Sequence, residues 1–127
     1  MKWSDIISIL QLLPRSRKHL IWVKKQLQTN SYDVLINQIY PESSINKLSI
    51  KIIVKSYFWA SRLVYNCRCL PRSIALYQQL KSLDYDVEHK FGVAKKNKNL
   101  AAHAWVEYQH KPLNESVDLK KLFKVLS

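Results

Sequence analysis

The sequence predicts a single α+β domain over residues 1–127, in which helices pack on one face of a small antiparallel sheet. Two observations support this prediction. Apolar residues recur at helical spacing through residues 1–83, whereas they alternate with polar residues in residues 87–94 and 102–108. The chain has 127 residues, which suffice for one hydrophobic core and are too few for two ordinary domains.

The first half of the domain, residues 1–64, is expected to be helical. Residues 6–13 place apolar side chains on one helical face, and Pro14 is expected to end that helix because proline lacks the N–H group. The other helices expected here are a basic helix over residues 16–28, a short helix between Ser31 and Pro41, and a helix capped by Ser43 or Ser44 with Ile45, Leu48, Ile52, Trp59 and Leu63 aligned.

The second half, residues 65–127, is expected to combine one helix with the sheet. The helix covers residues 70–83, and Cys69 falls on the same stripe as Ser73 one turn later. The remaining predicted elements are strands over residues 87–94, 102–108 and 111–113, a polar turn over residues 95–99, and a closing helix over residues 118–126. On the second strand, His103, Trp105 and Glu107 share one face.

The composition disfavours several classes of function. Gly92 is the sole glycine, so a glycine-rich phosphate loop cannot form. The four histidines lack metal-ligand spacing, and no metal or cofactor is expected. The formal net charge is +12, which implies an anionic partner or a surface that is screened by solvent and salt.

The two cysteines predict a reducing compartment. Cys67 and Cys69 are separated by one residue, which is too close for ordinary disulfide geometry, so both are expected to be free thiols. The apolar stretch over residues 6–13 is short and interrupted by polar residues, and it predicts neither a signal peptide nor a membrane span. A cytoplasmic protein is therefore expected.

Cys69 is the strongest candidate for a catalytic residue. Pro71 favours a helix that starts here, so the thiol would lie at a helix N-terminus, where free N–H groups and the helix dipole favour the thiolate. The same N–H groups can hold an oxyanion. A cysteine nucleophile also needs a base, for which His103 on a neighbouring strand is the candidate, and a third group that orients the imidazole. Candidates for that third group follow downstream at Asn114, Glu115 and Asp118.

Four short stretches stand out together: CLPRSIAL at residues 69–76, FGV at 91–93, AHAWVE at 102–107 and LNE at 113–115. They resemble the small, stand-alone transglutaminase-like proteases of bacterial lasso-peptide biosynthesis. The resemblance implies a papain-like fold and a cysteine peptidase that removes the leader from a ribosomally made precursor. It assigns Cys69 as nucleophile and His103 as general base. The family's third residue is usually an aspartate. Glu115 matches that position with one extra methylene, and Asp118 is the alternative.

The resemblance also implies partners. A separate leader-recognition protein would present the precursor, and an ATP-dependent lasso cyclase would act on the released core. The basic helix is expected to dock an acidic partner through residues such as Lys24 and Lys25. No signature of specific nucleic-acid binding is present.

Two other functions remain open at this point. A transglutaminase-type amide transfer would use the same triad and the same thioester, with an amine in place of water. A non-enzymatic basic binding module would use only the charge. Cys67 is expected to be a bystander, and His89 is expected to be a packed histidine.

Overall fold

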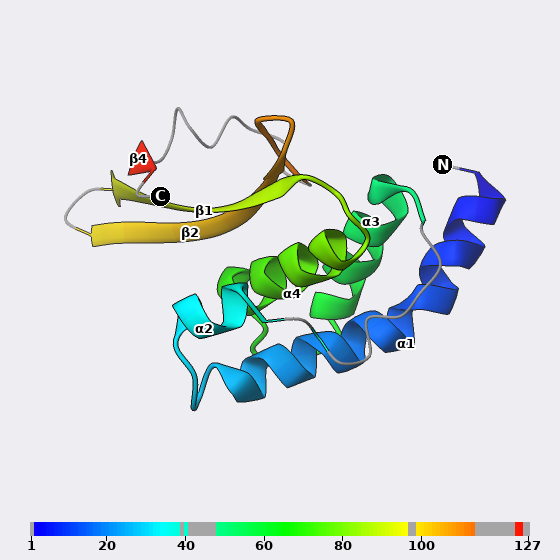
Figure 1. Cartoon of the computed structure of the whole chain (residues 1–127), viewed down its shortest axis with the longest axis horizontal. Helices are drawn as coiled ribbons and strands as arrows, with labels where there is room; N and C mark the ends of the chain where they lie inside the picture. Colours follow the sequence, from blue (N-terminus) through cyan, green and yellow to red (C-terminus); the bar gives the residue numbers. More distant parts are fainter. Residues whose placement is uncertain (1, 39, 41–47, 97–98, 114–123, 126–127) are drawn as a thin grey trace.

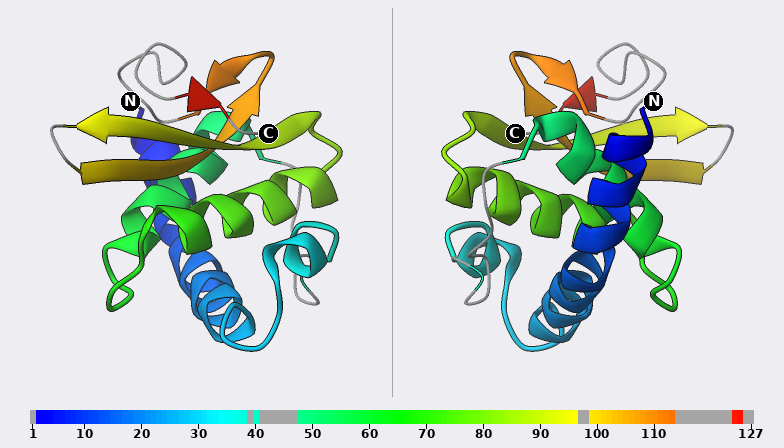
Figure 2. Two further views of the ribbon diagram at one scale, coloured as in Figure 1. Left: turned by 90° about the vertical axis from the view of Figure 1, so that its left-hand side faces the viewer. Right: turned by 90° about the vertical axis from the view of Figure 1, so that its right-hand side faces the viewer.

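The computed structural model describes residues 2–38, 40, 48–96, 99–113 and 124–125. Its elements are α1 (Trp3–Gln26), α2 (Tyr32–Ile36), α3 (Ile50–Ser61), α4 (Cys69–Ser82), β1 (Val87–Lys96), β2 (Asn99–Tyr108), β3 (Lys111–Pro112) and β4 (Lys124–Val125). The hairpin of β1 and β2 forms one layer, and the helices lie on one side of it with α4 nearest the sheet (Figure 1). Figure 2 shows this two-layer arrangement from both sides. The α+β prediction is confirmed.

The sequence predicts that Pro14 ends the first helix, and this prediction is wrong. The proline lies inside α1, which runs unbroken from Trp3 to Gln26. Pro14 is on the exposed side of the helix, so the carbonyl of Leu10 that loses its partner can bind water. The buried stripe continues past it through Ile9, Leu12, Ser16, His19, Leu20 and Val23. Four of these side chains are apolar, and burying each is worth about 1.5–3 kcal/mol, which outweighs the roughly 3 kcal/mol cost of an interior proline.

The third helix starts later than predicted and turns a different face inward. Ser49 is its N-cap and accepts a hydrogen bond from the backbone N–H of Ile52 at 3.4 Å. The predicted caps Ser43 and Ser44 lie outside the described residues. The buried stripe of α3 contains Ile53, Val54, Ser56, Tyr57, Ala60 and Ser61, in place of the predicted stripe through Ile52, Trp59 and Leu63. Leu63 follows the helix and is exposed.

The sheet has the strand order β3-β2-β1-β4 in the described part of the chain. The hairpin pairs antiparallel from Val87 opposite Tyr108 to Lys96 opposite Asn99, so both strands extend into the predicted polar turn. Short strand β3 pairs with the end of β2, as predicted, and β4 pairs with β1. The closing helix predicted over residues 118–126 is wrong at Lys124–Val125, which form that strand. The pairing with β1 supplies backbone partners that local helix propensity cannot predict.

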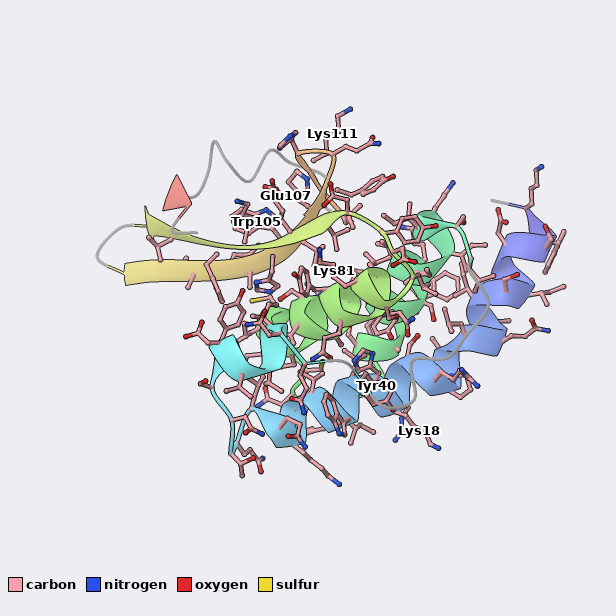
Figure 3. The ribbon with its side chains drawn as sticks, in the orientation of Figure 1. Lys18, Tyr40, Lys81, Trp105, Glu107 and Lys111 are labelled. Atoms are coloured by element: carbon pink, nitrogen blue, oxygen red, sulfur yellow. The ribbon has the colours of Figure 1, made fainter. Side chains whose placement is uncertain are left out.

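The register decides which residues of the hairpin face the helices. His89 contacts Ser73 of α4, and its cross-strand neighbour Val106 belongs to the same core as Ile74 and Leu76. Alternation along β2 therefore places Ala104, Val106 and Tyr108 toward α4. His103, Trp105 and Glu107 lie on the opposite face. Figure 3 shows Trp105 and Glu107 on the side of the sheet away from α4.

A buried polar network joins the helices beneath the sheet. His19 of α1 is fully buried, with Nδ1 2.6 Å from the hydroxyl of Tyr57 and Nε2 2.7 Å from Oε1 of Gln78. The Gln78 amide in turn donates to the carbonyl oxygen of Leu35, at the end of α2, at 2.8 Å. Tyr40 stacks on the imidazole, with ring centroids 4.0 Å apart. The network thus links all four helices.

We expect the stability of the fold to fall between about pH 6.5 and pH 4. Burial lowers the pKa of His19 from 6.5 to about 4, against the hydrogen bond to Gln78, and burial lowers the pKa of His89 to about 4 as well. Unfolding therefore takes up protons in this window, and stability is fully present only above it. Each histidine should contribute a slope of about 1.4 kcal/mol per pH unit.

Urea unfolding at a series of pH values measures this slope. His89→Gln should remove about half of it, because one of the two buried histidines is then absent. A free energy of unfolding that is the same at pH 7.5 and pH 5.5 would contradict the prediction.

Candidate active site

Cys69 is the first residue of α4. The preceding residue, Arg68, has extended backbone angles and forms the N-cap without a side-chain hydrogen bond, and Arg72 N–H donates to the Arg68 carbonyl at 3.3 Å. Pro71 has no N–H, so the free donors of the first turn are the backbone N–H groups of Cys69 and Leu70. The thiol is half-buried and free. Its place at a helix start, predicted from Pro71, is confirmed.

The start of α4 carries no negative charge in its first turn. That turn contains no acidic residue, and it is flanked by Arg68 and Arg72. Arg68 Nε donates to Asn66 Oδ1 at 3.3 Å, and Arg72 lies over the ring of Phe58 with its guanidinium carbon 5.4 Å from the ring centroid. The free N–H groups and the helix dipole can therefore stabilise an oxyanion here without competition from a carboxylate in that turn.

Cys67 differs from Cys69 in its environment. Burial raises the pKa of the Cys67 thiol, and the nearby charges of Arg72 and Lys24 offset only part of this rise. Cys67 therefore remains a neutral thiol at neutral pH. This environment fits the prediction that Cys67 is a bystander.

His103 lies in the middle of β2 and is half-buried. Its imidazole stacks on the Trp105 indole at a centroid distance of 5.9 Å, and the indole N–H donates to the buried Glu107 carboxylate at 2.9 Å. The residue opposite His103 on β1 is Gly92. Because glycine has no side chain, no cross-strand side chain of β1 stands directly opposite the imidazole.

The structure brings the elements that carry Cys69 and His103 together, but the His103 side chain lies on the face of β2 away from α4, so the two reactive groups do not meet. Arg72 and Ser73 of α4 line one pocket with Ala104 and Trp105 of β2, so the start of the helix lies beside this part of the strand. In both Figure 1 and Figure 2, β2 is the strand of the hairpin nearer to α4. Among the described side chains, His103 stacks on Trp105 and forms no hydrogen bond with Cys69.

The candidates for the third catalytic residue all lie outside the described residues. They are Asn114, Glu115 and Asp118. The described chain before them ends at Leu113, whose N–H donates to the Val106 carbonyl at 2.9 Å. Val106 is three residues from His103 along β2.

A second histidine lies closer to the face of α4 that carries Cys69. His89 of β1 is buried, with Nε2 2.7 Å from the Ser73 hydroxyl and Nδ1 2.9 Å from the Tyr32 hydroxyl. Ser73 also donates to the Leu70 carbonyl at 3.0 Å. Both ring nitrogens of His89 are thus occupied, and its low pKa keeps it neutral, so the prediction of a packed histidine is confirmed. The hydrogen bond to Ser73 was not predicted, although the shared stripe of Cys69 and Ser73 pointed to this face.

The family model of the transglutaminase-like superfamily matches residues 47–127. The chain belongs to this superfamily. The matched segment contains Cys69, His103 and Glu115, and it begins after α1 and α2. Searches of curated proteins and of solved structures return no match.

Membership in the transglutaminase-like superfamily confirms the predicted fold and supports an enzyme built on the fold of cysteine proteases and transferases. In the described part of the chain, no three His, Cys, Asp or Glu side chains gather as a metal site. No described helix is long and apolar enough to cross a membrane.

We expect iodoacetamide to alkylate Cys69 faster than Cys67 at neutral pH. The reason is that Cys69 lies at the N-terminus of α4, whose first turn has free N–H groups and no acidic residue, whereas burial raises the pKa of Cys67. Trypsin cleaves after Arg62, Arg68 and Arg72, so the two thiols fall in different peptides, residues 63–68 and 69–72, and mass spectrometry can follow each separately. Faster labelling of Cys67 in the folded chain would contradict this assignment.

Proposed function

We propose that this chain is a cysteine peptidase that removes the leader from a ribosomally made lasso-peptide precursor. The observation that carries the proposal is the placement of Cys69 at the first position of α4, beside the strand that bears His103, within the segment matched to the transglutaminase-like superfamily. The sequence resemblance described above supplies the substrate class.

In the proposed reaction, the Cys69 thiolate attacks the scissile carbonyl carbon, and the oxygen gains the negative charge. The backbone N–H groups at the start of α4 stabilise that oxyanion. His103, protonated by the thiol, gives its proton to the leaving amine as the carbon–nitrogen bond breaks. Water, deprotonated by His103, then hydrolyses the thioester and regenerates the thiol.

His103 must reach Cys69 for this reaction, and its side chain starts on the face of β2 away from α4, so the imidazole has to turn around the edge of the strand. One feature of the site supports such a movement. In the described residues β3 pairs with β2 only at Glu107 and Tyr108, so β2 is an edge strand beside His103. Catalytic hydrogen bonds are often long before substrate binds.

The proposed partners follow from the same resemblance. A separate leader-recognition protein presents the precursor, and an ATP-dependent cyclase takes the released core. The proposed compartment is the cytoplasm, where both cysteines stay reduced. Glu115 is the proposed third catalytic residue, with Asp118 as the alternative.

We expect Cys69→Ala and His103→Ala each to lower the rate of precursor cleavage by about a thousandfold or more, because the thioester and the proton transfer depend on them. The assay combines precursor, recognition protein and this chain, with mass spectrometry of the products. Cys67→Ala and His110→Ala are matched controls that should cleave like the parent.

Two outcomes would overturn the proposed reaction. One is unchanged cleavage by Cys69→Ala. The other is a product that gains an added amine in place of water, which would indicate amide transfer by the same thioester.

We expect Glu115→Gln to lower the cleavage rate by about a hundredfold or more, because a neutral amide cannot stabilise the imidazolium form of His103. Asp118→Asn is the matched variant and should retain most of the activity. The pH profile of the rate distinguishes an orienting carboxylate from a structural residue, since loss of the carboxylate should lower the pKa of the catalytic histidine. If Asp118→Asn loses activity and Glu115→Gln does not, the role belongs to Asp118.

A further inference from the structure

The outer face of α1 carries an exposed apolar stripe followed by positive charge. Trp3, Ile7 and Leu10 are 79%, 52% and 54% exposed and follow one another at i, i+4 and i+7. The same face continues toward the C-terminal end of α1 through the exposed residues Pro14, Arg17, Lys18 and Lys25. We call these seven residues the α1 outer face.

The α1 outer face is not used by the fold of this chain. The opposite side of the helix provides the buried stripe that packs on α3 and α4. The family match begins at residue 47, so α1 lies outside the matched segment. A tryptophan and two large aliphatic side chains on one exposed face form the kind of apolar patch that marks an interaction site.

The charge of α1 indicates what covers this face. Residues 2–26 contain six lysines and arginines against one carboxylate, Asp5. The chain as a whole carries +12, which disfavours a second copy of itself as the occupant. A partner that fits has an apolar groove for the first turns of α1 and acidic side chains beside its later turns.

The structure also removes one residue from the predicted docking surface. Lys24 donates to the backbone carbonyl of Tyr65, in the loop that leads to Cys69, and its ammonium lies 5.9 Å from the Tyr65 ring centroid. Reversing this charge would disturb the loop before the nucleophile as well as any partner. Lys25 remains exposed on the α1 outer face.

We infer that the α1 outer face is the docking site for an acidic protein with an apolar groove, and that this protein is the leader-recognition partner. The second half of the inference rests on the proposed function. The interface would use a helix outside the matched segment that contains Cys69 and His103.

The test measures binding of the leader-recognition protein encoded with this chain to the Cys69→Ala protein, so that catalysis is not needed. A triple variant should weaken binding by about tenfold or more; it combines Trp3→Ser, Ile7→Ser and Leu10→Ser. A double variant, Arg17→Glu with Lys18→Glu, should weaken binding most at low salt. Val34→Ser and Lys81→Glu change an equally exposed apolar residue and a lysine elsewhere, and both should bind like the parent.

Alkylation of Cys69 in each variant, made in the otherwise unaltered chain, shows that the active site is intact. Unchanged binding in the α1 variants overturns the docking site, as does full-rate precursor cleavage without any second protein. If the parent chain binds anionic phosphatidylserine vesicles and the α1 variants lose that binding, while binding of the protein is unaffected, the face belongs to a membrane surface. If the parent chain forms dimers in sedimentation and the variants of the apolar stripe do not, the face mediates self-association. Both would overturn the inference. Failure of the parent to cleave the precursor contradicts the proposed function without affecting the binding result.

Discussion

The arrangement of the helices depends on the hydrogen bonds of one buried histidine. The amide of Gln78 donates to the Leu35 carbonyl, so its oxygen is left to accept from His19. His19 therefore carries its proton on Nε2, and its Nδ1 accepts from the Tyr57 hydroxyl at 2.6 Å, a shorter contact than the 3.2 Å from that hydroxyl to Gln79 Oε1. Apolar packing alone tolerates small rotations of one helix against another, whereas this set of donors and acceptors is satisfied in one arrangement. Removing any partner would leave a buried polar group unpaired, at a cost of about 1–3 kcal/mol.

A second neutral histidine, His89, fixes the position of the helices against the sheet through its hydrogen bonds. His89 joins Ser73 of α4 and Tyr32 of α2 to β1. Helix α4 is thus held at Ser73 by the sheet and at Gln78 by α1, on two of its four turns. Cys69 lies one turn before Ser73, so the network that fixes the rotation of α4 also fixes the direction of the proposed nucleophile.

Local sequence signals predicted the features that depend on local chemistry. Pro71 identified the start of α4, and alternation identified the hairpin. The failures required knowledge of distant packing. Pro14 is tolerated because it faces solvent while the opposite side of α1 is buried, and the inward face of α3 is the one that brings Tyr57 to His19. Alternation also predicted that His103 and Trp105 share one face of β2, but it did not predict which face meets α4. The face that meets α4 follows from the register of β2 with β1, in which Val106 lies opposite His89.

The placement of His103 has a consequence for how the proposed site would work. Cys69 is on a helix that is fixed by buried hydrogen bonds, whereas His103 is on an edge strand opposite a glycine. In the proposed reaction the imidazole is therefore the group that would move, around the edge of β2 from the face away from α4. The loss of the Trp105 stack by itself would cost about 0.5–1.5 kcal/mol, the usual value for a stacked aromatic pair. A charged hydrogen bond of imidazolium with thiolate is worth about 1.5–3 kcal/mol, which is enough to offset that loss once bound substrate excludes water from the start of α4. In this arrangement the thiolate would gain its partner only when a peptide is in place.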